Sequence, residues 1–184
     1  MAINHSERGH ALLSASGAKR WMKCPPSARM EDMFEDVTSN YAREGTLAHE
    51  LSELKLRKYL SPLGIKKYNS ELKKIKSDDL YKNEMDGFTE FYVDHIKELL
   101  MKFNGNPIST TVVEKKVNFS EYVPDGFGTA DFISIDIEKK VLYVRDLKYG
   151  KGVPVFAENN PQLMLYALGA YLEYSLYFDI DLID

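Results

Sequence analysis

Along the first hundred residues, apolar side chains recur every three or four positions, which is the spacing of amphipathic helices. Leu47, Leu51 and Leu54 follow it until Ser61-Pro62 and Gly64 interrupt the pattern. A later stripe contains Met85, Phe88, Tyr92, Ile96, Leu99 and Phe103. The pattern predicts a loose arm over residues 1–13, a short helix capped by Ser14 or Ser16 and ending near Met22, and helices over about 28–36, 42–60 and 79–103.

The spacing changes to every second residue after Gly105-Asn106-Pro107, which predicts β-structure. The expected strands are Thr110–Phe119, Gly128–Ile137 and Val141–Tyr149. Asn159 or Asn160, followed by Pro161, then starts a helix to about Tyr174, and Tyr177–Leu182 begins a last strand. This order predicts an α/β (α+β) fold, with an antiparallel meander flanked by helices in one domain spanning residues 1–184.

Composition narrows the chemistry that such a domain can carry. The chain has 184 residues, of which 44% are hydrophobic and 28% charged, with a formal net charge of -4. This profile is not that of a disordered or membrane protein, and its longest apolar runs are too short to span a bilayer. With no signal-peptide pattern at the N-terminus, we expect a cytoplasmic protein. Cys24 is the single cysteine, so any metal must be held mainly by oxygen and imidazole.

The hairpin formed by the second and third strands carries the strongest chemical signal. A turn centred between Glu138 and Lys139 makes the numbers of cross-strand partners sum to 277. Asp131 then faces Asp146. On the same face the hairpin carries four aliphatic residues nearer the turn, Ile133, Ile135, Leu142 and Val144, and Lys148 lies two residues after Asp146. Two opposed carboxylates repel each other, so a shared proton, Lys148 or a divalent cation must offset the repulsion. The alternative is that both aspartates flank a loop at the solvated end of the hairpin.

Three other features are individually weak. His49 and Glu50 lie near the start of a helix with Glu53 one turn beyond His49; alone, His49 is more typical of a hydrogen-bonded or surface histidine. Gln162 and Tyr166 share a helix face at i, i+4. Lys151 lies in a glycine loop without P-loop spacing, where it could touch a phosphate or remain solvated.

A run of basic residues, in a stretch where Glu53 and Glu71 are the only acids, has two interpretations. It contains Lys55, Arg57, Lys58, Lys66, Lys67, Lys73, Lys74 and Lys76. A solvated helix face plus loop is the favoured interpretation, and a phosphate-binding strip is the other.

Taken together, five short motifs in order resemble the RecB-like, phage exonuclease-like branch of the PD-(D/E)XK nuclease superfamily. They are Leu13-Ser14-Ala15-Ser16 with Cys24-Pro25, Gly45 to Glu50, Gly128-Thr129-Ala130-Asp131, Asp146-Leu147-Lys148, and Gln162 with Tyr166. The resemblance spans nearly the whole chain. It implies a restriction-endonuclease-like core with a mixed central sheet.

The resemblance also implies residue roles. His49, Asp131, Asp146 and the Leu147 carbonyl would bind Mg²⁺ or Mn²⁺. Lys148 would orient the attacking water and, with Asp131 and Asp146, complete the catalytic set. The expected accessory residues are Gln162, Tyr166, Lys151, Glu50 and Glu114. Relatives that carry an iron–sulfur cluster use one early and three late cysteines, so no cluster is expected here.

The implied activity is divalent-metal-dependent hydrolysis of DNA by an exonuclease of phage or prophage origin, acting in the cytoplasm of a bacterial host. DNA is the expected partner, with a homo-oligomer or a recombination protein as further partners. Relatives usually continue with more sheet and helix, so we expect a shortened C-terminus. The alternatives are a non-catalytic DNA- or protein-binding module that keeps the fold, and a structural phage protein in which His49 lies far from the aspartates.

Overall fold

The computed structural model describes residues 11–34, 38–61, 63–150 and 154–184. The chain forms two compact units that share its segments. The first contains residues 1–36, 114–146 and 156–184, and the second contains residues 37–113 and 147–155. Most of the predicted arm over residues 1–13 therefore lies outside the described residues. Among those described, no helix is both long and apolar enough to cross a bilayer.

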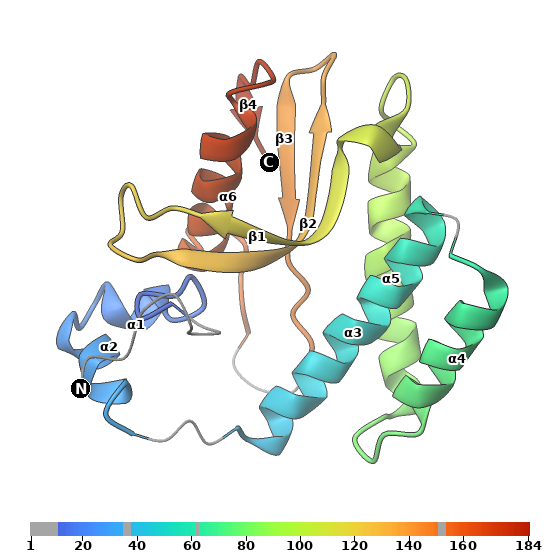
Figure 1. The fold of residues 1–184 in the computed structure, drawn as a ribbon, viewed down its shortest axis with the longest axis horizontal. Helices are drawn as coiled ribbons and strands as arrows, with labels where there is room; N and C mark the ends of the chain where they lie inside the picture. Colours follow the sequence, from blue (N-terminus) through green and yellow to red (C-terminus); the bar gives the residue numbers. More distant parts are fainter. Residues whose placement is uncertain (1–10, 35–37, 62, 151–153) are drawn as a thin grey trace. The chain divides into compact units, whose positions relative to one another are not determined.

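A four-stranded mixed sheet in the order β1-β2-β3-β4 organises the first unit (Figure 1). The strands are β1 (Thr111–Asn118), β2 (Phe127–Asp136), β3 (Val141–Arg145) and β4 (Leu182–Ile183). β2 and β3 are antiparallel and β3 and β4 are parallel. The mixed sheet with flanking helices confirms the predicted α/β class.

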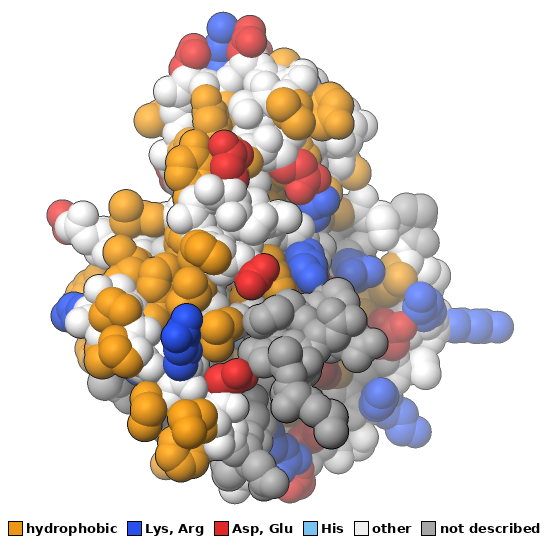
Figure 2. Space-filling model, turned by 60° about the vertical axis from the view of Figure 1, so that its left-hand side comes forward, with side chains coloured by type: hydrophobic (Ala, Val, Ile, Leu, Met, Phe, Trp, Pro, Cys, Tyr) orange, Lys and Arg blue, Asp and Glu red, His pale blue; other side chains and the backbone are white. Residues whose placement is uncertain are grey.

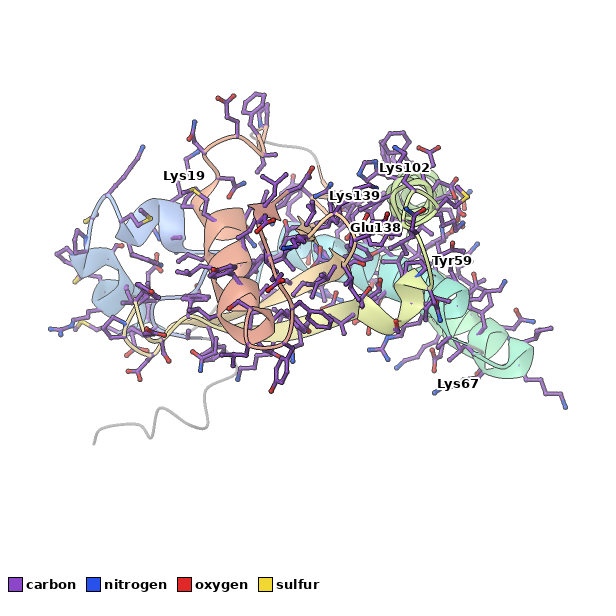
Figure 3. All side chains as sticks on the ribbon, turned by 90° about the horizontal axis from the view of Figure 1, so that it is seen from above. Lys19, Tyr59, Lys67, Lys102, Glu138 and Lys139 are labelled. Atoms are coloured by element: carbon purple, nitrogen blue, oxygen red, sulfur yellow. The ribbon has the colours of Figure 1, made fainter. Side chains whose placement is uncertain are left out.

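The register of the β2–β3 hairpin matches the prediction. Ile133 pairs with Val144 and Ile135 with Leu142, so partner numbers sum to 277. These four side chains are buried. Figure 3 labels Glu138 and Lys139 at the turn between the two strands. The alternation of apolar residues and the turn position were together sufficient to determine this pairing.

Helix α6 (Pro161–Tyr174) packs against β2 and β3. Asn160 caps it, because its side chain accepts hydrogen bonds from the backbone N–H groups of Gln162 (3.0 Å) and Leu163 (3.4 Å). An ion pair of 2.6 Å between Lys115 on β1 and Glu173 joins the other end of the helix to the sheet. A 3.4 Å hydrogen bond from Gln162 to Asp146 Oδ1 places the start of α6 beside the segment that follows β3.

Two short helices, α1 (Ala18–Trp21) and α2 (Pro26–Glu31), complete the first unit. Each buries a single alanine, Ala18 in α1 and Ala28 in α2, while Met22, Met30 and Met33 stay exposed. Figure 2 brings this side of the first unit forward and shows hydrophobic side chains gathered on its face. Helices this short cannot bury a full apolar stripe, which explains the exposed methionines.

The second unit is a helical layer of α3 (Asn40–Leu60), α4 (Ile65–Lys76) and α5 (Asn83–Leu100). α3 packs against both α4 and α5. Its buried side chains include Leu47, Ala48, Leu51 and Leu54, which form a core with Ile75 and Met85. The predicted helix over 42–60 is therefore confirmed, and Ser39 caps it through a 3.1 Å hydrogen bond from the Ala42 N–H.

Several predicted boundaries were wrong. α4 occupies a stretch for which no separate helix was expected. β3 ends at Arg145 rather than Tyr149, and β4 covers Leu182–Ile183 rather than starting at Tyr177. Phe88, expected on the inner stripe of α5, is exposed, because the buried side of that helix runs through Met85, Thr89, Tyr92, Val93 and Ile96.

Asp86 joins all three helices of the second unit. Its carboxylate accepts hydrogen bonds from Lys76 and from the Tyr81 hydroxyl (2.6 Å), and forms a 3.2 Å ion pair with Lys55. Burial alone would raise the pKa of Asp86, but the hydrogen bonds from Lys76, Tyr81 and Lys55 outweigh it and lower that pKa to about 2. The charged carboxylate therefore stabilises the folded unit.

We expect Asp86→Asn to lower the free energy of unfolding at pH 7 by about 1–2 kcal/mol, after allowing for solvent screening. A lowered pKa contributes stability above its ordinary value of 3.8 and loses that contribution as the pH falls towards about 2. Urea unfolding between pH 5 and pH 2 measures both effects. Asp94→Asn, which breaks only an exposed pair with Lys97, is the matched control. Equal losses in the two variants would contradict this role for Asp86.

Candidate metal and nuclease site

The candidate site of the first unit is built around Tyr166. Its ring is buried on α6 and lies against Gly128 of β2. A Cβ atom at Gly128 would come within 2.6 Å of Tyr166 Cε1 and 3.3 Å of the Ala15 Cβ. Glycine is therefore needed here to let the ring approach the strand. The contact gives a structural reason for the glycine in the Gly128-Thr129-Ala130-Asp131 motif.

Asp131 and Glu114 bring two carboxylates together in the same unit. Asp131 lies on β2 and only 6% of it is exposed, while Glu114 on β1 is half-buried. One carboxylate oxygen of each residue lies within 4.8 Å of the other. Two carboxylates at this separation repel unless a cation or a proton lies between them.

The backbone of Glu114 is itself unusual. Its φ is 52°, in the left-handed region that a long L side chain adopts only at a cost. Such a residue within a strand disturbs the regular alternation of side chains and redirects its own. Strain of this kind is concentrated at functional sites, where the required side-chain direction outweighs it. Glu114 was expected to be an accessory residue, and its conformation raises its importance.

Asp146 reaches the site from just beyond the end of β3. The ladder ends with the pair Phe132 and Arg145, so the predicted pairing of Asp131 with Asp146 lies one step beyond it in the same register. The Gln162 side-chain amide lies 3.4 Å from Asp146 Oδ1 and donates to the Tyr166 hydroxyl at 2.9 Å. Gln162 and Tyr166, which were predicted to share one face of α6, are therefore linked to the Asp146 carboxylate through the Gln162 amide.

The pKa of Tyr166 depends on its burial and on the charges of the three acids. Burial raises its pKa to about 12, and the charges of Asp146, Asp131 and Glu114 add to that increase, while the hydrogen bond from Gln162 opposes it. At neutral pH the phenol is therefore uncharged and keeps its proton. Glu114 lies on β1, Asp131 on β2 and Asp146 directly after β3, and the negative charge of each adds to the increase in the pKa of Tyr166.

This environment of Tyr166 should be visible as a loss of stability at high pH. A raised pKa contributes stability that is complete below the ordinary value of 10.0 and is lost as the pH rises towards about 12. The shift corresponds to at most about 3 kcal/mol. Urea unfolding in EDTA between pH 9 and pH 12 should show a smaller decrease for Tyr166→Phe than for wild type. Tyr177→Phe, at an exposed tyrosine, is the control; equal slopes for wild type and Tyr166→Phe would contradict the assignment.

The remaining predicted site residues belong to the second unit or lie outside the described residues. His49 is half-buried on α3, and Glu50 is exposed on the same helix. Leu147 is buried and Lys148 is exposed in the segment that directly follows Asp146. Their assignments as ligands, catalytic lysine and accessory residue stay predictions. Lys151 falls outside the described residues.

Sequence reasoning overlooked the role of Gly128 and the burial of Asp136. Asp136 is the second acid on β2, but it serves the hairpin turn: its carboxylate pairs with Lys139 Nζ at 3.0 Å and accepts from the Lys139 N–H at 3.1 Å. The Ile137–Lys140 turn after Asp136 was the available signal, since an acid that precedes a turn commonly binds turn backbone.

The donor set at Tyr166 fits a hard divalent cation. Glu114, Asp131 and Asp146 supply carboxylate oxygens, which Mg²⁺ and Mn²⁺ prefer. The closeness of the Glu114 and Asp131 oxygens, with Asp131 almost fully buried, is the arrangement that a cation would stabilise most. The residues present therefore fit the metal that the sequence analysis predicts.

Comparison with known proteins yields one family. The sequence profile of a family described as "Protein of unknown function (DUF2800)" matches residues 10–184. No solved structure matches the chain.

Proposed function

This chain belongs to the DUF2800 family, and we propose that it is a divalent-metal-dependent deoxyribonuclease of the exonuclease type. The observation that carries the proposal is the close approach of the Glu114 and Asp131 carboxylates, with Asp146 linked through Gln162 to the buried Tyr166 in the same unit. It agrees with the resemblance to PD-(D/E)XK nucleases that the sequence motifs carry. DNA is the proposed substrate, in the cytoplasm of a bacterial host and in a phage or prophage setting.

Hydrolysis of a phosphodiester bond requires a nucleophile at neutral pH and compensation of developing negative charge. A bound Mg²⁺ or Mn²⁺ supplies both, by lowering the pKa of water and acting as a Lewis acid. Glu114, Asp131 and Asp146 would hold the ion, and His49 and the Leu147 carbonyl are further ligands predicted from the resemblance. Lys148, two residues after Asp146, would orient water and stabilise charge on the phosphoryl oxygens.

Gln162 and Tyr166 act as positioning residues. The Gln162 amide contacts Asp146 and Tyr166 at once, so it limits the rotation of the Asp146 carboxylate. Tyr166 remains protonated at neutral pH, because burial and the nearby acids keep its pKa high. Outer contacts of this kind typically change metal affinity or activity by about 10–100-fold when removed.

A catalytic role accounts for this arrangement better than a binding module does. The neighbouring carboxylates of Glu114 and Asp131 repel both each other and a DNA phosphate, so they weaken binding unless a cation is present. The left-handed backbone of Glu114 adds a further conformational cost at the same place. A module that only bound DNA or protein would gain nothing from either feature.

The proposal is tested by degradation of end-labelled linear DNA and of circular DNA, with Mg²⁺, Mn²⁺ or EDTA. Wild type should degrade linear DNA only when metal is present, and Asp146→Ala should not degrade it. Resistance of circular DNA supports exonuclease action, whereas its cleavage would replace that assignment by an endonuclease. If neither protein cuts and both bind DNA equally, a non-catalytic module with the same fold replaces the nuclease.

A further inference from the structure

Charge is segregated between two helices of the second unit. α4 has the sequence IKKYNSELKKIK, with five lysines and one glutamate. α5 has the sequence NEMDGFTEFYVDHIKELL, with five acids and one lysine. Although the whole chain has a net charge of -4, α4 therefore presents a local excess of positive charge.

Four of the α4 lysines form a strip on its exposed surface, which we call the α4 strip: Lys66, Lys67, Lys73 and Lys74. Ile75 is buried on the inner side of the helix. Lys66 and Lys73 are seven residues apart, as are Lys67 and Lys74, so each pair lies along one side of the helix about 10 Å apart. The fifth lysine, Lys76, is engaged with Asp86 and is not part of the strip.

The cations of the α4 strip are weakly paired. Lys67 lies 3.9 Å from Glu71, at the limit of an ion pair. Lys66, Lys73 and Lys74 form no ion pair with any residue in the described part of the chain. Exposed and unpaired ammonium groups remain hydrated and available to an anionic partner.

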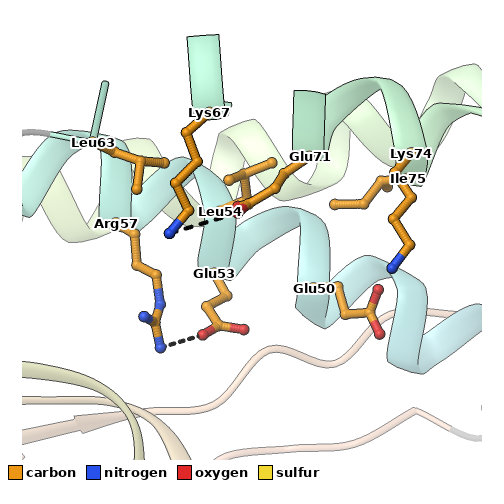
Figure 4. Close-up of a pocket in the computed structure, with 9 residues that line it drawn as sticks. All are labelled: Glu50, Glu53, Leu54, Arg57, Leu63, Lys67, Glu71, Lys74 and Ile75. Atoms are coloured by element: carbon orange, nitrogen blue, oxygen red, sulfur yellow. Dashed lines mark ion pairs between the residues drawn. The ribbon is translucent and has the colours of Figure 1, made fainter. Parts of the chain in front are cut away.

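The pocket beside the strip accounts for only part of the positive charge on α4. It has a volume of about 310 Å³ between α3 and α4 (Figure 4). Its charged lining residues are Glu50, Glu53, Glu71, Arg57, Lys67 and Lys74. Three acids balance three bases, and Arg57 already pairs with Glu53 at 2.6 Å. The pocket as a whole is close to neutral, and it shares Lys67 and Lys74 with the α4 strip. The positive charge that the pocket acids do not balance is therefore that of Lys66 and Lys73, which lie outside the lining.

We propose that the α4 strip binds the phosphodiester backbone of duplex DNA. The inference rests on the proposed nuclease function and extends it to how the substrate is held. Duplex DNA carries one negative charge per about 1.7 Å of axis, which suits a row of cations on one helix. Lysines on flexible stems bind phosphates as point charges and do not read bases, so the strip contributes affinity without sequence preference.

Binding to a labelled 30-base-pair duplex tests the strip. Fluorescence anisotropy is measured in EDTA from 50 to 300 mM salt, where affinity is read without hydrolysis. Replacing the four strip lysines by Gln should weaken binding about 10–100-fold and reduce the slope of log affinity against log salt by about 2–4. The charge-preserving Lys→Arg quadruple variant should retain wild-type binding. Lys19→Gln with Lys23→Gln, at exposed lysines of the first unit, should also retain it.

Three results would overturn the assignment: no duplex binding by wild type, an unchanged salt slope in the Gln variant, or an equal loss in the Lys19 and Lys23 control. If the Gln variant loses binding to poly-glutamate but keeps wild-type DNA binding, the strip binds an acidic protein and the DNA assignment is also overturned. Failure of the nuclease proposal is separable, because it appears as absent metal-dependent cleavage whatever the anisotropy shows. Thermal unfolding verifies that all variants are folded.

Discussion

Asp131→Asn is expected to reduce metal-dependent DNA cleavage by at least about 10²-fold, the largest effect in this chain. The substitution keeps the shape of a nearly buried side chain on β2 but removes the charge that a divalent cation needs. Initial rates on linear DNA at several Mg²⁺ concentrations measure the effect. Glu114→Gln should also lose activity, with a partial recovery at high Mg²⁺ if its main contribution is metal affinity.

Asp136→Asn is the matched control for Asp131→Asn. Asp136 is equally buried and lies on the same strand, but it is five residues away and therefore on the opposite face, where it serves the turn through Lys139. We expect it to lower the melting temperature while retaining cleavage per folded molecule. Similar activity losses in the two variants would show that the effect reports damage to β2 rather than loss of a ligand.

Gly128→Ala should destabilise the protein by about 1–3 kcal/mol and lower cleavage at the same time. The added methyl group would lie 2.6 Å from the ring of Tyr166, and a buried ring cannot move away without disturbing the Gln162 and Asp146 contacts. Denaturant unfolding and cleavage rates measure the two consequences. In a double-mutant cycle, Tyr166→Ala should remove much of the stability cost of Gly128→Ala, because the opposing ring is then absent.

Gly87→Ala provides the contrast for that prediction. Gly87 lies in α5, and nothing lies within 4 Å of a Cβ atom placed there. Alanine has the higher helix propensity, so this change should stabilise the protein by about 0.5–1 kcal/mol. A neutral result for Gly128→Ala, or an equal loss at both glycines, would contradict the close packing of Tyr166 on β2.

The parts of the fold that were predictable from sequence are those governed by local periodicity. The alternation of Ile133 and Ile135, together with the charged turn at Glu138, specified the hairpin register. Asn160 and Pro161 specified the start of α6. Both are short-range signals, in which neighbouring residues determine the geometry.

The rest depends on tertiary contacts that periodicity does not report. α4 has apolar residues at 65, 68, 72 and 75, a helical spacing that its dense lysines obscured. β3 stops at Arg145, and the Asp146 carboxylate directly after it accepts a 3.4 Å hydrogen bond from Gln162 on α6. The left-handed backbone of Glu114 has no sequence signal, since glutamate rarely adopts it. The approach of Glu114 to Asp131 was therefore not predictable from the sequence pattern.

Binding of Mn²⁺ measured by electron paramagnetic resonance tests the central claim most directly. The account predicts saturable binding to wild type that is displaced by Mg²⁺, strongly weakened in Asp131→Asn and in Glu114→Gln, and preserved in Asp136→Asn. Saturable binding unchanged by Asp131→Asn and Glu114→Gln, or no binding to the folded wild type, would contradict a metal centre at these carboxylates.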